Sequence, residues 1–193
     1  AGDTPIIVSC VHKSHLDYLL VGETIYQSLR SLPAMIAGKN LFHGLFRYLL
    51  PRLKAVCLDR VRTSPKNLRS RDNLLYLTTF YKYLMEEVIA RGDIITIFPE
   101  AGRSYNGRLL PLSLGVFGIA KRALQAGAPR VALVPVAVSY DRVTEDMRFG
   151  GLSQIKTQSR RAYRRHDVAG FYEHALLQPR SDTYVDFGRP LYI

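Results

Sequence analysis

Short apolar runs alternate with longer stretches of helical periodicity along this chain, and this alternation constrains the fold more than any other feature. Apolar runs of four to ten residues fit buried strands, and the stretches between them are long enough for helices. Strands that alternate with helices are typical of layered α/β domains. The pattern therefore predicts an α/β fold in which helices cover a central sheet.

The expected elements can be placed by residue number. We predict strands at 6–10, 34–37, 56–59, 94–98, 131–140 and 184–187. Apolar residues recur at helical spacing from Leu74 to Val88, and Gly92 follows at the position of a C-terminal cap. A second helix is expected over 116–125, ending before Gly127. We find no internal repeat.

Size and charge limit the domain count and the partners. A chain of 193 residues with 47% hydrophobic content forms one substantial core, so we expect one domain over 1–193, excised from a longer chain. The 27 Lys and Arg residues outnumber 16 Asp and Glu, for a formal net charge of +11. The expected partners are therefore anionic: phosphorylated metabolites, nucleic acid or an acidic lipid surface.

The apolar runs also indicate the compartment. None approaches the roughly 18 apolar residues of a membrane-spanning helix, since the longest candidate, 131–140, has strand length and contains a proline. The two cysteines, Cys10 and Cys57, both lie in apolar runs, where a buried, inert thiol is the expected state. This pattern fits a reducing compartment.

Two further segments allow a structural and a functional interpretation. Segment 41–53, LFHGLFRYLLPRL, carries its apolar residues on one helical stripe. Core packing is the first expectation for this stripe, and an acyl-chain groove or a membrane-surface helix is the alternative. Segment 142–180 holds eight Lys or Arg against four acidic residues, including RRAYRR at 160–165. It predicts either a solvated basic face or a contact with anionic headgroups.

The stretch VHKSHLDY, 11–18, places two histidines close to an aspartate directly after an apolar run. A carboxylate that orients an imidazole and stabilises its protonated form makes it a useful base, so His12 or His15 with Asp17 is a candidate catalytic dyad. Ser14 and Asp17 also match the S-x-x-D capping box of a helix N-terminus. The dyad requires His12 in a loop and Asp17 in the first helical turn, and the two interpretations compete for one carboxylate.

Three more stretches fall at predicted strand ends, where α/β domains carry ligands. They are CLDR at 57–60, FPEAGRSYNGR at 98–108 and VPVAVSY at 134–140. Arginine presents planar, bidentate donors to phosphate, and glycine lets backbone N–H groups approach an anion closely. Arg60 and Arg103 are therefore candidate ligands of an anionic oxygen, with a surface salt bridge as the alternative for each.

These stretches together resemble the conserved blocks of the glycerolipid acyltransferases, the family of glycerol-3-phosphate and lysophosphatidate acyltransferases. HKSHLD fits the family's H-x-x-x-x-D motif through His12 and Asp17, and FPEAGRS resembles F-P-E-G-T-R-S. CLDR resembles F-I-D-R, VPVAVSY resembles the V-P-V block, and GKNLF at 38–42 looks like the family's lysine-containing stretch. The resemblance implies an α/β domain with a central mixed β-sheet.

The resemblance also implies roles for individual residues. His12 would be the general base and Asp17 its orienting partner. The implied substrate-binding residues are Lys39, Arg60, Glu100, Gly102, Arg103, Ser104 and Pro135. This chain departs from the family where Ala101 and Gly102 replace a Gly-Thr pair, and PLSLG at 111–115 lacks the lysine that often precedes its glycine.

The expected activity is transfer of a fatty acyl group from acyl-CoA or acyl carrier protein to the sn-1 hydroxyl of glycerol 3-phosphate in phospholipid synthesis. VSYDRV at 138–143 resembles the glycerol-3-phosphate branch more than the lysophosphatidate branch. The alternatives are a lysophosphatidate acyltransferase and a non-catalytic module that binds anionic lipid.

The remaining expectations concern cofactors and location. No metal or other cofactor is expected, because thioester transfer needs no Lewis acid and the histidines lack a third ligand at suitable spacing. Nucleic acid is not an expected partner, because no RNA-binding motif occurs. We expect a peripheral protein on the cytoplasmic side of an anionic membrane.

Overall fold

The computed structural model describes residues 4–14, 16–100, 102–104, 108–141 and 182–193. The strands are β1 (Ile6–Cys10), β2 (Ala34–Gly38), β3 (Ala55–Leu58), β4 (Ile95–Ile97), β5 (Ala132–Tyr140), β6 (Thr183–Phe187) and β7 (Leu191–Tyr192). The helices are α1 (Asp17–Leu29), α2 (Phe46–Arg52), α3 (Arg71–Tyr83) and α4 (Gly118–Gln125), with short helical turns η1 (Lys39–Leu41), η2 (Leu84–Ile89) and η3 (Leu114–Phe117).

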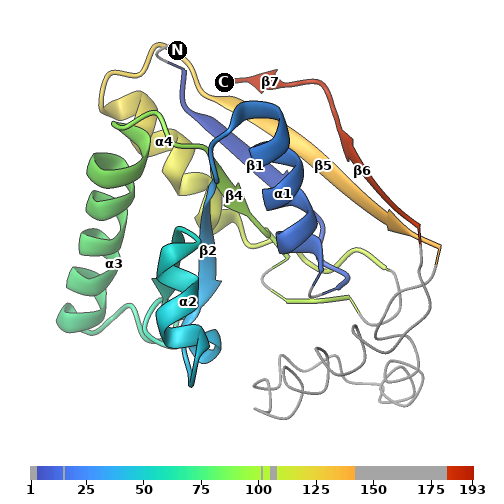
Figure 1. Cartoon of the computed structure of the whole chain (residues 1–193). Coiled ribbons are helices and arrows are strands. Elements are labelled where there is room, and N and C mark those ends of the chain that lie inside the picture. Colours follow the sequence, from blue (N-terminus) through green and yellow to red (C-terminus); the bar gives the residue numbers. More distant parts are fainter. Residues whose placement is uncertain (1–3, 15, 101, 105–107, 142–181) are drawn as a thin grey trace.

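The described strands form one mixed sheet in the order β3-β2-β4-β1-β5-β6, and β7 also pairs with β5 (Figure 1). The strands from β3 to β5 in this order are parallel to their neighbours, whereas β6 and β7 run antiparallel to β5. This arrangement confirms the prediction of a central mixed sheet flanked by helices.

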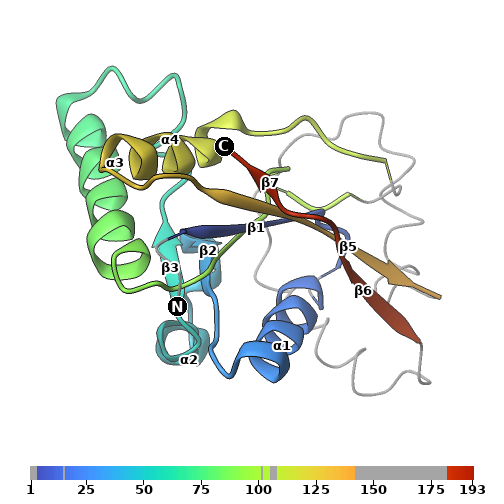
Figure 2. The same ribbon diagram turned by 90° about the horizontal axis from the view of Figure 1, so that it is seen from above.

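Helices cover both faces of the sheet, with α1 and α2 on one face and α3 and α4 on the other (Figure 2). Because side chains alternate along a strand, β1 contributes to both cores. Ile7 packs with the cluster that includes Phe80, Leu84 and Ile119, whereas Val8 and Cys10 pack with α1. Two buried apolar layers therefore hold β1 in the middle of the domain.

The six predicted strands are confirmed to within one residue at each end, and the two predicted helices are also present. The helix that follows the 74–88 periodicity is α3, which continues as a π-helical turn, η2, and Gly92 adopts a positive φ of 75° behind it. Gly127 likewise follows the end of α4 with a positive φ, of 100°. Strand β7 and most of α1 were not predicted.

The expectation that segment 41–53 is a core-packed helix is wrong. The helix α2 covers only Phe46–Arg52, and Gly44, with a φ of 54°, separates it from η1. No residue of α2 is buried. Leu45 and Tyr48 are 77% and 62% exposed, because the helix lies beside the edge strand β3 and nothing in the described part of the chain covers its outer side.

The two cysteines differ from each other, contrary to the expectation of two buried thiols. Cys10 is buried in the central strand β1, as predicted, but Cys57 is exposed on β3. The prediction failed for Cys57 because β3 lies at the edge of the sheet, where an apolar strand keeps one accessible side.

The basic segment 142–180 lies outside the described residues, so its two interpretations stay predictions. Over the residues that the structure does describe, no helix has both the length and the apolar character needed to cross a bilayer.

Candidate active site

Parallel strands bring four of the sequence motifs to one edge of the sheet. His12 follows β1, Lys39 follows β2, Arg60 follows β3 and Glu100 follows β4. These four strands are mutually parallel, so their carboxyl ends lie at the same edge. Loops at this edge are where α/β sheets place their ligands. Tertiary structure thus gathers residues that are up to 88 positions apart, as in the contact from His12 to Glu100.

The His12–Asp17 dyad is formed as the sequence predicted. His12 lies in the loop after β1, Asp17 begins α1, and the chain turns back between them. The imidazole Nδ1 lies 2.9 Å from Asp17 Oδ2, and the Asp17 side chain is almost completely buried. Because Asp17 engages Nδ1, the imidazole nitrogen left to accept a proton from a substrate is Nε2.

The same carboxylate also makes capping-box bonds, but to N–H groups of the loop that precedes the helix and not to those of α1 itself, so the two interpretations do not compete. Asp17 Oδ2 accepts the backbone N–H groups of Lys13 at 2.6 Å and Ser14 at 2.9 Å. The Ser14 hydroxyl in turn accepts the N–H of Leu16 at 3.1 Å. These bonds tighten the loop around His12, so the capping function of Asp17 is part of how the histidine is positioned.

A second buried carboxylate holds the backbone of His12. Glu100 is 3% exposed, and its Oε1 accepts the His12 N–H at 3.0 Å. Its Oε2 accepts the N–H of Leu110 at 2.8 Å. The carbonyl of His12 accepts the N–H of Ser104 at 2.8 Å, so the loop after β4 clamps the histidine on both sides.

The block 98–104 therefore holds the backbone of His12 in place. The Ser104 hydroxyl donates to the carbonyl of Arg108 at 2.6 Å, which closes the loop on itself. A Cβ on Gly102 would meet its nearest neighbours at ordinary van der Waals distance, so packing alone does not demand glycine there. Arg103, which is partly exposed, lies between Gly102 and Ser104 in the chain.

An aromatic ring lies against the imidazole, and a buried thiol lies in the adjacent strand β1. The Phe98 ring lies 4.6 Å from the His12 ring, centroid to centroid. Burial raises the pKa of the Cys10 thiol to about 12, and the negative charges of Asp17 and Glu100 add to this effect. Cys10 is therefore neutral near pH 7 and does not compete with an alcohol as a nucleophile.

The cationic part of the edge is more exposed. Lys39 forms an ion pair with Asp59 at 3.0 Å, and the hydrogen bond that Lys39 donates to Asp59 raises the pKa of Lys39 above its ordinary value. Partial burial raises the pKa of Asp59, but the bonds from Lys39 and from the N–H groups of Arg62 and Val61 more than reverse this, so the net pKa is lowered. Both groups are charged at neutral pH.

Arg60 packs against the end of β2. A Cβ built on Gly38 would lie 2.5 Å from the Asn40 side-chain oxygen and 3.4 Å from Arg60 Nε. A side chain at position 38 would therefore displace the Asn40 side chain, and glycine permits this close approach, a role that the sequence pattern had not indicated. The only sequence signal was its position directly before Lys39 in GKNLF.

Pro135 lies inside a strand and not in a loop, although the register places it level with Ile97 at the carboxyl end of β4. It lies within β5, paired with Ser9 of β1, well before the carboxyl end of the strand. The antiparallel neighbour of β5 changes from β6 to β7 at this point, and Gly188 donates to the Pro135 carbonyl at 2.8 Å. The break in the ladder accommodates a residue that has no N–H. A substrate contact by Pro135 stays a prediction, and its position indicates a structural role.

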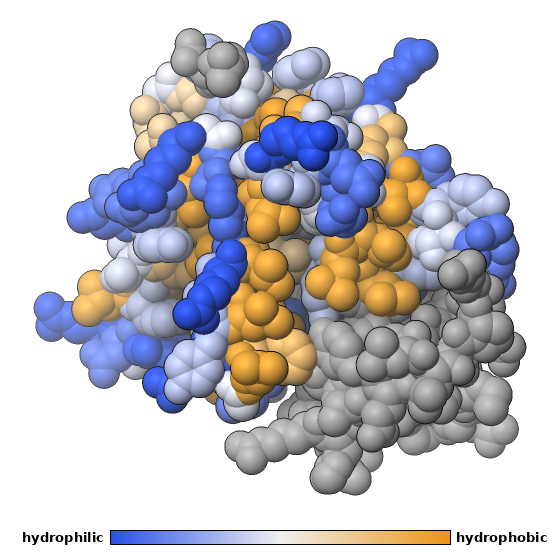
Figure 3. Space-filling view, in the orientation of Figure 1, coloured by the Kyte–Doolittle hydropathy of each residue, from blue (hydrophilic) through white to orange (hydrophobic). Residues whose placement is uncertain are grey.

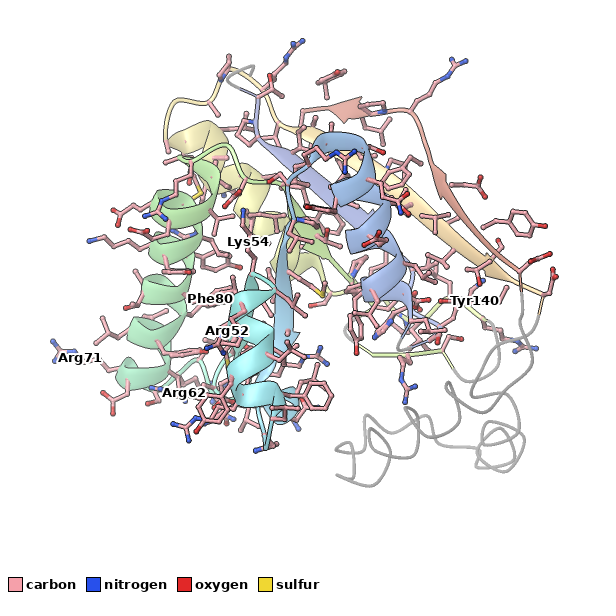
Figure 4. All side chains as sticks on the ribbon, viewed as in Figure 1. Arg52, Lys54, Arg62, Arg71, Phe80 and Tyr140 are labelled. Carbon is pink, nitrogen blue, oxygen red and sulfur yellow. The ribbon has the colours of Figure 1, made fainter. Side chains whose placement is uncertain are left out.

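Tyr140 is a site residue that the sequence analysis missed. Its hydroxyl donates a hydrogen bond to Asp17 Oδ1, and Figure 4 shows it beside the N-terminal end of α1. The available signal was its place at the end of a predicted strand in VPVAVSY. His15, the other candidate base, lies outside the described residues.

Within the described ranges, no group of three or more His, Cys, Asp or Glu side chains is arranged to hold a metal ion. The expectation that the reaction needs no metal stays a prediction.

The fold and the site define an α/β domain with a carboxylate-oriented histidine at the carboxyl edge of its sheet, flanked by cations. The family model described as Acyltransferase matches residues 2–139, and the chain belongs to this family.

Relatives in sequence agree with this assignment. The chain is 31% identical over 191 residues to "Glycerol-3-phosphate acyltransferase" of Alteromonas mediterranea, and 32% identical over 193 residues to the protein of that name from Glaesserella parasuis serovar 5. Each match covers 98% of this chain and 22% of the relative's length. The 1-acyl-sn-glycerophosphate acyltransferase PlsC from Thermotoga maritima is 20% identical, with a TM-score of 0.44 over 72% of this chain and 45% of that one.

Proposed function

We propose that this domain transfers a fatty acyl group from an acyl-CoA or acyl carrier protein thioester to the sn-1 hydroxyl of glycerol 3-phosphate. The observation that carries the proposal is the oriented His12–Asp17 dyad at the same sheet edge as Lys39 and Arg60. The names of the relatives support the choice of acceptor. The chain spans 22% of the length of these relatives, so the activity of the whole protein is itself part of what we propose.

The proposed chemistry uses one proton acceptor. His12 Nε2 removes the proton from the acceptor hydroxyl while its oxygen attacks the thioester carbonyl, and the buried Asp17 carboxylate stabilises the imidazolium that forms. The tetrahedral intermediate then collapses, the C–S bond breaks, and the imidazolium returns its proton to the leaving thiolate. A new ester and a free thiol are the products.

The cations supply the binding of the acceptor in this proposal. The phosphate of glycerol 3-phosphate needs charged donors, and arginine side chains bind it in a bidentate manner. Arg60 and Arg103 are the proposed ligands, with Lys39 as an additional positive charge. A clamp on the phosphate fixes the hydroxyl against His12, where an error of about 1 Å costs roughly a hundredfold in rate.

The test offers the purified protein three acceptors with acyl-CoA and follows the release of free thiol. We expect glycerol 3-phosphate to be preferred over both lysophosphatidate and glycerol. Arg103→Lys keeps the charge but loses the planar fork, so it should reduce the use of glycerol 3-phosphate far more than that of glycerol.

Arg130→Lys is the matched control for this variant, because Arg130 stacks on Tyr192 near the start of β5. Equal losses of activity with both acceptors in Arg103→Lys would detach Arg103 from the phosphate. A wild-type preference for lysophosphatidate would assign the alternative activity.

We also propose that α2 contacts an anionic membrane from the cytoplasmic side. Leu45, Leu49 and Leu53 recur at four-residue spacing and are all exposed, and apolar surface gathers in this region between hydrophilic side chains (Figure 3). Arg47 and Arg52 lie on the same short helix. An exposed apolar row with basic flanks suits the interface of a bilayer, where the acyl product must be delivered.

Vesicle sedimentation tests this contact. Binding to vesicles with anionic lipid should weaken with salt, and Leu49→Gln should reduce it severalfold. Leu191→Gln, which changes an exposed leucine on β7, is the control. Equal binding of wild type and Leu49→Gln would contradict the proposal. So would a concentration-dependent dimer that Leu49→Gln abolishes, because the row would then face a second copy of the chain.

A further inference from the structure

The Asp17 carboxylate is held from two sides by different parts of the chain. Its Oδ2 receives three donors from the loop after β1: His12 Nδ1 and the backbone N–H groups of Lys13 and Ser14. Its Oδ1 receives the hydroxyl of Tyr140. Asp17 is 0% exposed, so protein groups rather than bulk water must satisfy both oxygens.

The geometry of the sheet explains how a residue 123 positions away reaches this carboxylate. The parallel ladder between β1 and β5 ends at the pair Cys10 and Val136, and β5 continues for residues 137–140 beyond it. At about 3.3 Å per residue, this overhang extends roughly 13 Å past the end of β1. Tyr140 is thereby brought level with the first turn of α1.

Because side chains alternate along β5, Tyr140 lies on the same face of the sheet as Val136 and Val138. Val136 and Val138 pack in the same buried cluster as Val21 of α1, and Tyr140, two residues further, packs against that cluster as well. The antiparallel pairing of Tyr140 with Thr183 holds the end of the strand in place. The tyrosine therefore sits on a braced strand, which is a rigid platform for a hydrogen bond.

We propose that Tyr140 is a positioning residue for acyl transfer that acts through Asp17. By holding Oδ1, the hydroxyl prevents the carboxylate from rotating away from the plane in which Oδ2 meets His12 Nδ1. It also keeps the second oxygen of a fully buried carboxylate satisfied. This inference rests on the proposed function for its kinetic consequence, but the coupling of the three side chains is independent of the substrate.

Tyr140→Phe removes the hydroxyl and keeps the ring, so it is the direct test. We expect kcat to fall about tenfold, with the KM values for acceptor and thioester changed less than twofold, because the hydroxyl acts through Asp17 and not on a substrate. The ring nitrogen resonances of His12, recorded by NMR without substrate, should also shift. Tyr184→Phe is the matched control, because Tyr184 lies across the ladder from Ser139 and is exposed.

The NMR measurement separates this inference from the proposed function. If the wild type transfers no acyl group but Tyr140→Phe still shifts the His12 resonances, the proposed activity fails and the coupling stands. Unmoved His12 resonances, or a change in KM alone, would overturn the inference.

A measurement on the wild type covers the case in which Tyr140→Phe does not fold. A hydrogen-bonded Tyr140 hydroxyl proton should give a downfield resonance that exchanges slowly with water. If no such resonance is observed, the inference is wrong.

Discussion

The two halves of the sheet edge are built in different ways. On the β1 and β4 side, Asp17 and Glu100 are buried, and both oxygens of each carboxylate accept hydrogen bonds from the protein. On the β2 and β3 side, Lys39 is largely exposed, and Arg60 is also exposed. One half holds its charges rigidly inside the protein, and the other presents them to solvent.

This difference matches two separate tasks. A general base must be held within a fraction of an ångström of its partner, and buried hydrogen bonds provide that rigidity. An anion-binding surface gains from accessible cations, because they attract the ligand from solution and exchange water for phosphate. The comparison predicts that changes on the buried half lower kcat, whereas changes on the exposed half raise KM.

The largest effect is expected for His12→Ala. Removing the general base should lower kcat by about 10²- to 10⁴-fold, while the melting temperature changes little because the side chain contributes modest packing. Acyl transfer measured by thiol release, with thermal unfolding alongside, tests this expectation. His15→Ala is the control and should be much milder; the reverse order would assign the base to His15.

Asp17→Asn should come next and should affect both rate and stability. The amide cannot stabilise the imidazolium, so we expect a loss in kcat of about 10²-fold or more. The capping bonds from Lys13 and Ser14 also lose their charged acceptor, which should cost about 1–3 kcal/mol in the free energy of unfolding. Denaturant unfolding and kinetics on the same sample measure both. A full loss of rate with unchanged stability would show that the capping bonds contribute nothing.

Glu100→Gln tests whether the buried half includes the block that the resemblance assigned to substrate. Both oxygens of Glu100 accept backbone N–H groups, and a glutamine amide nitrogen cannot accept either of them. We expect kcat to fall about tenfold as the His12 backbone loosens, with KM for glycerol 3-phosphate little changed. If KM for the phosphate acceptor changes markedly and kcat does not, Glu100 belongs to the binding half instead.

The smallest effect is expected for Lys39→Ala on the exposed half. We expect KM for glycerol 3-phosphate to rise a few-fold, less so at high salt, with kcat unchanged. Lys121→Ala, an exposed lysine on α4, is the control. A loss confined to kcat would place Lys39 with the catalytic half and break the comparison.

The ion pair between Lys39 and Asp59 also leads to a prediction about pH. The lowered pKa of Asp59 means that its contribution to stability is present above its unfolded pKa of about 3.9 and is lost as pH falls through the folded value. The raised pKa of Lys39 means that its contribution is lost only as pH rises through a value above about 10.4. The small difference in melting temperature between wild type and Lys39→Ala should therefore vanish in acid, once the pH has fallen through the lowered folded pKa of Asp59. A difference that persists there would have another cause.

Much of the fold was predictable because strand and helix periodicities are local properties of the sequence. The strand ends are within one residue of those predicted, and Gly92 and Gly127 follow their helices at positive φ. The failures concern exposure. Segment 41–53 and Cys57 are apolar in sequence but lie beside or on the edge strand β3, and strand order is not encoded in any local pattern.

The sequence by itself determined the α/β class, the five-residue separation of His12 and Asp17, and the strand ends that carry Lys39, Arg60 and Glu100, because each depends on neighbours along the chain. Tertiary structure alone decided the long-range contacts of the two buried carboxylates, Asp17 and Glu100. Glu100 meets the His12 backbone because β4 lies next to β1, and Tyr140 meets Asp17 because β5 extends beyond the end of β1. These contacts depend on strand order and register, which result from the packing of the whole sheet.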